Sequence, residues 1–242
     1  GISRSWLSEF LEKYKDKIGL PFLCNLQPNM INEDLIIQLK DAGVDKVGFG
    51  IECGNEEFRK TILNRNVTNK QIIETGDLLN KYKIRFYTAN IVGFPGETLD
   101  LAFETVRLNQ RIGPEVAACS VLQPFPGTMV YNYALENDFL KEDTTISDFG
   151  AQKTWTSGDK RVNSLINQDN IDELVNLNSF FDIIVQHPRL ERVVRLLIKF
   201  KPNAIFNFIS QWGFFKMYYK YSDNYKDRLR LSWRFVKPLL PF

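Results

Sequence analysis

Residues 45–52 alternate between apolar side chains and small or polar ones, with the period of two that is typical of a β-strand. The first group is Val47, Phe49 and Ile51, and the second is Gly48, Gly50 and Glu52. In a parallel sheet the bulky face packs against helices, so the glycine face is expected to leave room for a ligand against the backbone. Because α/β enzymes bind ligands at the carboxyl ends of their strands, Glu52 is a candidate ligand-binding carboxylate.

The rest of the chain up to Thr128 alternates between helix-spaced and strand-spaced apolar residues. Strands are expected at residues 20–26, 45–52, 85–92 and 116–123, and helices at 6–14, 32–39, from Asn55 onward, 70–82 and 99–112. This alternation, with a period of roughly 30 to 40 residues, is typical of right-handed βαβ units and a parallel sheet. Every strand ends in a loop rich in glycine, proline and polar residues, so these loops are expected at one edge of the sheet.

The pattern changes after Met129. Residues 143–170 are polar with few apolar pairs, and helical spacing returns from Ile171. We therefore expect an α/β fold of parallel βα units in residues 1–142 and a mainly helical region in residues 143–242.

Charge also changes along the chain, near residue 187. Residues 187–242 contain 12 Lys and Arg against 3 Asp and Glu, whereas residues 1–186 contain 19 against 26. The overall composition, 44% hydrophobic and 25% charged, is that of a globular protein with a sizeable core. The C-terminal region is thus basic, and it is also rich in aromatic residues.

The three cysteines, Cys24, Cys53 and Cys119, match no disulfide framework and no zinc site. Scattered thiols indicate a reducing compartment, so a cytoplasmic protein is expected. The sequence has neither a run of 18 apolar residues nor a signal peptide. It starts at Gly1 and not at Met, which suggests that the N-terminus is a cut.

Several common sites are disfavoured by the sequence. Gly48-x-Gly50-x-x-Cys53 lacks the third glycine of a dinucleotide fingerprint, and its glycines lie within the strand instead of in the following turn. Residues 93–98 lack the Gly-Lys-Ser/Thr of a phosphate-binding loop. A single histidine, His187, nearly excludes a histidine-based metal site or a Ser-His-Asp triad.

Two readings of Glu52 and Arg65 remain open. Glu52 is either a structural carboxylate paired with a cation or a ligand-binding group at the end of a strand. Arg65 is either a solvated charge near a helix end or a bidentate partner for a ligand carboxylate.

Taken together, the four strand ends resemble radical S-adenosylmethionine (radical SAM) enzymes, best the subgroup with a cobalamin-binding domain. The matching segments are residues 22–31, 47–55 with 63–68, 91–98 (IVGFPGET, the most specific) and 123–128. The resemblance implies the C-terminal part, about four strands, of a partial TIM-like (βα)6 barrel. It covers residues from about the N-terminus to Leu140.

The resemblance also implies roles for individual residues. Asn25 would lie near the methionyl amino group of S-adenosylmethionine, Glu52 would bind the ribose hydroxyls and Arg65 the methionyl carboxylate. The adenine would contact Ile91, Gly93, Phe94 and Phe125. Ala89 holds a position that is polar in some relatives, so neighbouring Asn90 is the expected substitute for that ribose contact.

One departure from the family concerns its [4Fe–4S] cluster. The family binds the cluster through C-x-x-x-C-x-x-C, and this spacing does not occur here. We therefore expect the chain to be the C-terminal part of a longer enzyme and inactive alone, with the cluster ligands and the cobalamin domain in the parent. The parent would generate a 5′-deoxyadenosyl radical, accept electrons from a donor protein, and perform methyl transfer or rearrangement on a small organic substrate.

The C-terminal region admits two interpretations. The first is a helical subdomain that packs on the barrel. The second is a peripheral membrane surface, which would fit a lipid-like substrate: Arg189, Arg192, Arg195 and Lys199 recur at helical spacing opposite Leu190, Val193, Val194, Leu197 and Ile198. Nucleic-acid binding is disfavoured, because no basic-aromatic strand platform is found.

Two other functions stay open at this point. A degenerate barrel that lacks the cluster would serve as a ligand- or partner-binding module. A different βα-barrel enzyme, such as an aldolase, is disfavoured because no lysine ends a buried strand; Lys46 lies at the start of its strand, on the opposite rim.

Overall fold

The computed structural model describes residues 3–140, 144, 164–206, 208–210 and 212. The chain groups into two compact units, which are described separately. The first unit is Gly1–Val92 with Glu97–Ser120, and the second is Gly93–Gly96 with Val121–Phe242. Residues 121–140 thus group with the helical region. The expected boundary between residues 142 and 143 lies next to residues outside the described part and stays a prediction.

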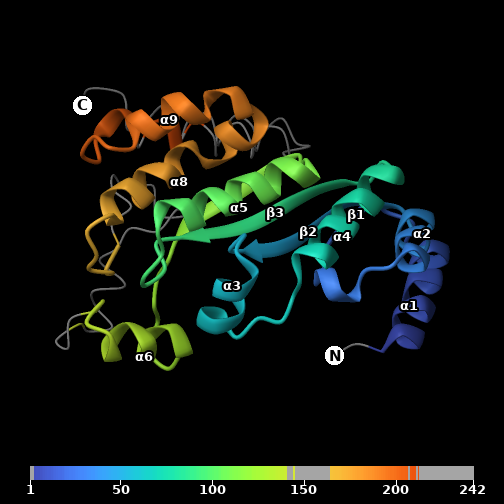
Figure 1. Ribbon diagram of the computed structural model, residues 1–242. Coiled ribbons are helices and arrows are strands. Elements are labelled where there is room, and N and C mark those ends of the chain that lie inside the picture. The colour runs from blue at the N-terminus through green and yellow to red at the C-terminus, as the bar shows by residue number, and fades with distance from the viewer. Residues whose placement is uncertain (1–2, 141–143, 145–163, 207, 211, 213–242) are drawn as a thin grey trace, which may run out of the picture. The chain divides into compact units, whose positions relative to one another are not determined.

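Four parallel strands form one sheet in the order β1–β2–β3–β4 (Figure 1). They are β1 (Phe22–Asn25), β2 (Val44–Glu52), β3 (Arg85–Val92) and β4 (Val116–Val121). This confirms the predicted α/β fold. The third strand has the predicted bounds, whereas the first is shorter at both ends and the fourth ends at Val121, two residues early.

The helices of the first unit are α1 (Arg4–Lys17), the short η1 (Pro28–Met30), α2 (Glu33–Asp41), α3 (Glu56–Leu63), α4 (Asn69–Lys81) and α5 (Leu99–Ile112). Two of them, α2 and α3, begin after the predicted caps Asn32 and Asn55. Asn32 and Asn55 accept hydrogen bonds from the backbone N–H groups of Leu35 and Phe58, which satisfies donors that a helix start leaves open. Thr68 caps α4 through a reciprocal capping box with Gln71.

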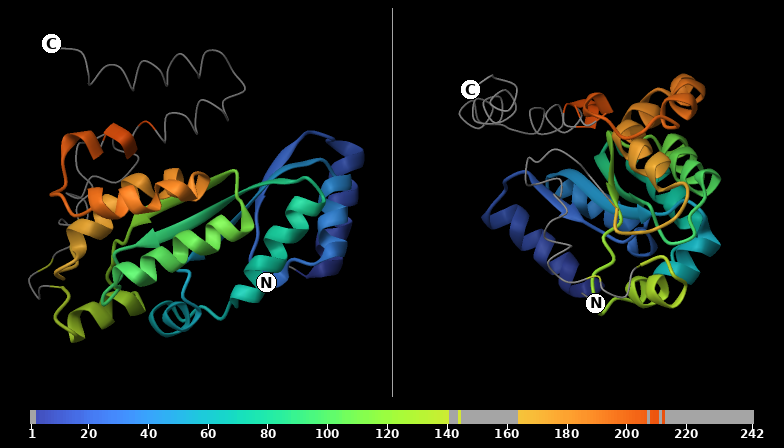
Figure 2. Two further views of the ribbon diagram at one scale, coloured as in Figure 1. Left: turned by 45° about the horizontal axis from the view of Figure 1, so that its top comes forward. Right: turned by 90° about the vertical axis from the view of Figure 1, so that its left-hand side faces the viewer.

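The core lies between the sheet and its helices. Val47, Phe49 and Ile51 are at most 3% exposed. They share one apolar cluster with residues of four helices, which include Leu11, Ile36, Leu39, Ile72, Leu79, Leu108 and Ile112. Helices α4 and α5 pack on β3 (Figure 2). The predicted apolar face of β2 is confirmed, and burial of each such side chain stabilises the fold by about 1.5–3 kcal/mol.

The second unit is helical in its described part. It contains α6 (Met129–Glu136), α8 (Ile171–Gln186), η2 (Pro188–Leu190) and α9 (Glu191–Leu197). The helical pattern after Ile171 is confirmed, and α6 was not predicted. Most of the predicted polar stretch 143–170, and the aromatic residues after Trp212, lie outside the described residues.

The predicted amphipathic surface of α9 is only partly exposed. Val194 and Ile198 are buried in the second unit, whereas Leu190 and Val193 are exposed. None of the described helices is long and apolar enough to cross a membrane. Membrane contact therefore stays a prediction.

Candidate functional site

Strand β2 ends in a sharp turn centred on Glu52. Its φ of 62° lies in the left-handed region, where a residue other than glycine costs about 1–3 kcal/mol. The N–H of Cys53 bonds back to the carbonyl of Ile51 at 2.8 Å, which closes a three-residue turn. The register with β3 also shifts between Gly50 and Glu52. A strained turn of this kind aims a side chain that a regular strand could not present.

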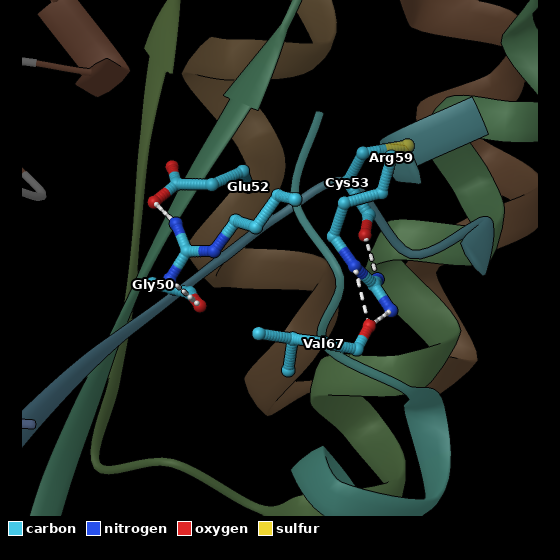
Figure 3. A network of polar contacts seen from close by, with 6 residues as sticks. Gly50, Glu52, Cys53, Arg59 and Val67 are labelled. Carbon is cyan, nitrogen blue, oxygen red and sulfur yellow. Dashed lines mark hydrogen bonds and ion pairs between the residues drawn. The ribbon is translucent and has the colours of Figure 1, made fainter. Parts of the chain in front are cut away.

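Glu52 pairs with Arg65, the other predicted ligand-binding residue (Figure 3). Nη1 of Arg65 lies 2.6 Å from Oε1 of Glu52, and Nη2 donates to the carbonyl of Gly50 at 3.1 Å. The side chains are 20% exposed for Glu52 and 27% for Arg65. Burial raises the pKa of Glu52, although the ion pair with Arg65 opposes this effect. The pair is thus partly desolvated and still reachable from solvent.

The glycine face of β2 is not open as predicted, because polar side chains of the same chain cover it. A Cβ at Gly50 would lie 2.0 Å from Oε1 of Glu52, and one at Gly48 would lie 2.3 Å from both Asn25 and Tyr87. The two glycines are needed to admit these side chains. A ligand on this face would contact the side chains and not the bare backbone.

Tyr87 is the residue of this face that the sequence analysis missed. Its hydroxyl donates to Oδ1 of Asn25 at 2.6 Å, and both residues are register partners of Gly48. The signal was present in the alternation of β3, which places Tyr87 on the same face as Ala89 and Ile91. Because Asn25 lies in β1 and Tyr87 in β3, their contact spans β2 at Gly48, and a predicted site residue is thus held by a strand that is not its direct neighbour.

Asn90 lies on the opposite face of β3, in a buried polar network. It is 2% exposed, and its Nδ2 donates to Thr88 and to the carbonyl of Ala118, while its Oδ1 accepts from Asn109 at 2.8 Å. Asn109 and Thr88 have no exposed surface. These contacts favour a structural role over the ribose contact that was predicted for Asn90.

The remaining predicted residues fall at the end of β3 and in the second unit. Ile91 is half-buried in the first unit. In the second unit, Gly93 has a φ of 84°, Phe94 is fully buried and Phe125 is 54% exposed. The glycine is required by its left-handed backbone. The adenine contacts predicted for these residues stay a prediction.

The three cysteines are free thiols that come from β1, from the turn after β2 and from β4. Burial raises the pKa of Cys24 to about 11 and that of Cys53 to about 12, and it raises that of Cys119 well above its ordinary value. Among the residues that the structure describes, no group of three His, Cys, Asp or Glu could hold a metal ion.

A family model matches most of the first unit. Residues 5–108 match the Radical SAM superfamily model, and this range includes Asn25, Glu52 and Arg65. Residues 5–108 are therefore similar to radical SAM proteins. The predicted resemblance is confirmed for this segment.

Two curated proteins are similar to this chain. The chain is 23% identical over 192 residues to a protein of Pyrococcus horikoshii described as an uncharacterized methyltransferase; the match covers 76% of this chain and 41% of the relative. It is 30% identical over 105 residues to a tRNA-2-methylthio-N(6)-dimethylallyladenosine synthase of Sulfurihydrogenibium sp., over 42% of this chain and 24% of the relative. The chain thus spans less than half the length of these curated relatives.

Among solved structures, the radical S-adenosylmethionine methyltransferase TsrM of Kitasatospora setae is similar, with 18% identity and a TM-score of 0.49. The match covers 58% of this chain and 29% of that one, which was solved with tryptophan and a SAM analogue bound.

Proposed function

We propose that this chain supplies the S-adenosylmethionine-binding strand ends of a radical SAM methyltransferase. The observation that carries the proposal is the half-buried Glu52–Arg65 pair at the end of β2, within the segment that matches the Radical SAM model. Methyl transfer is favoured over rearrangement by the description of the Pyrococcus horikoshii relative. The proposed enzyme also uses a [4Fe–4S] cluster, whose ligands lie outside this chain, and cobalamin, as the resemblance implies.

The chemistry of the site fits this ligand. A carboxylate accepts two hydrogen bonds from vicinal ribose hydroxyls, and a guanidinium binds a carboxylate through two parallel N–H groups. Asn25 offers an amide at the same face, held by Tyr87. S-Adenosylmethionine supplies the methyl group when bound. The residues of this chain bind and orient it, and Glu52 and Arg65 exchange their mutual contact for contacts with the ligand.

The proposal is tested by Glu52→Gln in the full-length protein that contains this chain. Because the amide removes the charge and one acceptor, affinity for S-adenosylmethionine in a calorimetric titration is expected to fall by roughly tenfold or more, in line with a lost charge-assisted hydrogen bond. The matched control is Glu57→Gln, which changes an exposed glutamate in the first turn of α3 and is expected to leave the affinity unchanged. Unchanged affinity in Glu52→Gln would refute the role of Glu52.

The second candidate function is a binding module without catalysis. It is favoured by the ion pair itself, because Glu52 and Arg65 already bond to each other and so need no ligand to balance their charges. The same titration separates the candidates: a binding module of this kind takes up no S-adenosylmethionine in the wild-type protein. The small-molecule substrate, the electron donor protein, a lipid-like substrate and cytoplasmic or membrane-associated localisation belong to the proposal and stay predictions.

A further inference from the structure

Arg59 of α3 has no exposed surface, which is unusual for a charged residue. Its guanidinium donates to the carbonyl of Cys53, to the carbonyl of Val67 through two nitrogens, and to Oδ1 of Asn69 at 2.9 Å. Two acceptors, the carbonyls of Cys53 and Val67, are backbone oxygens (Figure 3), and the third is a side-chain amide oxygen. Burying a charge is costly unless hydrogen bonds satisfy it, so the arrangement indicates a specific task for Arg59.

The contacts of Arg59 join the two segments that carry the candidate site. Cys53 directly follows Glu52, and Val67 lies two residues after Arg65. Asn69 strengthens the connection, because its Nδ2 donates to the carbonyl of Gly54 at 2.9 Å. One guanidinium therefore holds the end of β2 and the connection between α3 and α4 at a fixed separation.

Neither segment is fixed by regular secondary structure. Glu52 has a left-handed backbone, and so does Asn64, with a φ of 49° at the end of α3. Arg65 lies in the irregular connection between α3 and α4. Such conformations persist only when the surrounding structure imposes them.

We propose that Arg59 is the positioning residue of the candidate site, which sets the distance between the Glu52 carboxylate and the Arg65 guanidinium. The relevance of this distance to S-adenosylmethionine rests on the proposed function, whereas the positioning itself does not. Arginine is required because its planar fork reaches several acceptors at once, and the compact ammonium of lysine cannot do so.

The test is the energetic coupling between Glu52 and Arg65, measured by a double-mutant cycle of Glu52→Gln and Arg65→Gln in equilibrium unfolding. In the wild-type background we expect a coupling of about fivefold in the unfolding equilibrium constant, within the range known for residues in contact. In an Arg59→Lys background the coupling is expected to fall below about twofold. Coupling that survives Arg59→Lys overturns the proposal.

Two further variants separate positioning from general loosening. Lys46→Met removes another buried cation, 4% exposed and 3.8 Å from Glu115, at the opposite end of β2; it is expected to lower stability and leave the coupling intact. If Lys46→Met also abolishes the coupling between Glu52 and Arg65, the proposal that Arg59 positions this pair is wrong. If Arg59→Lys does not fold, Asn69→Ala takes its place, with a smaller loss of coupling expected and unchanged coupling overturning the proposal.

The ligand measurement is kept separate. Arg59→Lys in the full-length protein is expected to weaken S-adenosylmethionine binding by roughly tenfold, the scale of one well-placed hydrogen bond to a charged group. If the wild-type protein binds no S-adenosylmethionine, the proposed function fails while the coupling result for Arg59 still stands.

Discussion

Two polar clusters lie on opposite faces of the same sheet, and they differ in how their polar groups are satisfied. The pair at the end of β2, Glu52 and Arg65, is charged and 20–27% exposed. The network on the helix-covered face, formed by Thr88, Asn90 and Asn109, is neutral and at most 2% exposed. Its members bond one another and the carbonyls of Ala118 and Thr105.

The comparison shows why a polar residue near a strand end is not by itself a site residue. Opening the neutral network to a ligand would leave several buried groups without partners, at about 1–3 kcal/mol each. The ion pair can exchange partners at lower cost, because water already reaches it. The first cluster is therefore the better candidate for ligand binding, which stays a prediction, whereas the second is suited to holding the fold rigid.

The largest expected effect comes from Gly54→Ala, at the contact between the turn that follows β2 and helix α5. The N–H of Gly54 donates to Oγ1 of Thr105 at 2.7 Å, and a Cβ at Gly54 would lie 2.4 Å from the backbone nitrogen of Thr105. Because a helix backbone cannot move locally, α5 must shift, and we expect a loss of about 4 kcal/mol or more in the free energy of unfolding.

Gly113→Ala is the control for this substitution. Gly113 has a φ of 66° and no atom within 4 Å of an added Cβ, so only backbone strain of about 1 kcal/mol is expected. Chemical denaturation compares the two variants. Equal losses would show that the close approach of Gly54 to α5 has little energetic effect.

A smaller effect is expected from Asn109→Leu, which tests the neutral network alone. The change removes the partners of Thr88, Asn90 and the Thr105 carbonyl, and should lower the free energy of unfolding by about 2–4 kcal/mol. Affinity for S-adenosylmethionine is expected to change much less than in Glu52→Gln. The control, Lys60→Leu on the exposed side of α3, should stay within about 0.5 kcal/mol. If a folded Asn109→Leu protein lost much of its affinity for S-adenosylmethionine, the neutral network would contribute to binding, and the contrast between the two clusters would be wrong.

The smallest effect concerns pH, and it distinguishes the clusters by charge. Burial raises the pKa of Glu52 in the folded protein above its unfolded value. Between the unfolded and the folded pKa of Glu52, the folded state therefore binds more protons than the unfolded state. Relative to Glu52→Gln, the stability that Glu52 contributes is fully present below the unfolded pKa. It is lost as pH rises through the folded pKa. Denaturation of both proteins across this interval measures the trend. For Asn109→Leu, whose network contains no titrating group, the stability difference from wild type should stay constant with pH.

Much of the fold follows from local patterns. The alternation of β2 predicted its buried face, and the capping residues Asn32 and Asn55 predicted the starts of α2 and α3, because these signals depend only on neighbouring residues. The site was predicted less completely. Glu52 and Arg65 were expected beside the same loop, and the structure places them in contact, while their roles toward a ligand stay predictions. Their pairing and the contact of Tyr87 with Asn25 depend on tertiary contacts and on the register between strands.

The sequence by itself determined the βα order, the apolar face of β2 and the strand ends that resemble radical SAM enzymes. Periodicity and turn residues encode these features locally. Only the tertiary structure decided that Asn90 lies in a buried network, that Tyr87 and Asn25 cover Gly48, and that Arg59 holds the two segments of the site. Each of these depends on contacts between residues that are distant along the chain. Asn25 and Asn90 are both asparagines near a strand end, but packing gives them different partners and therefore different surroundings.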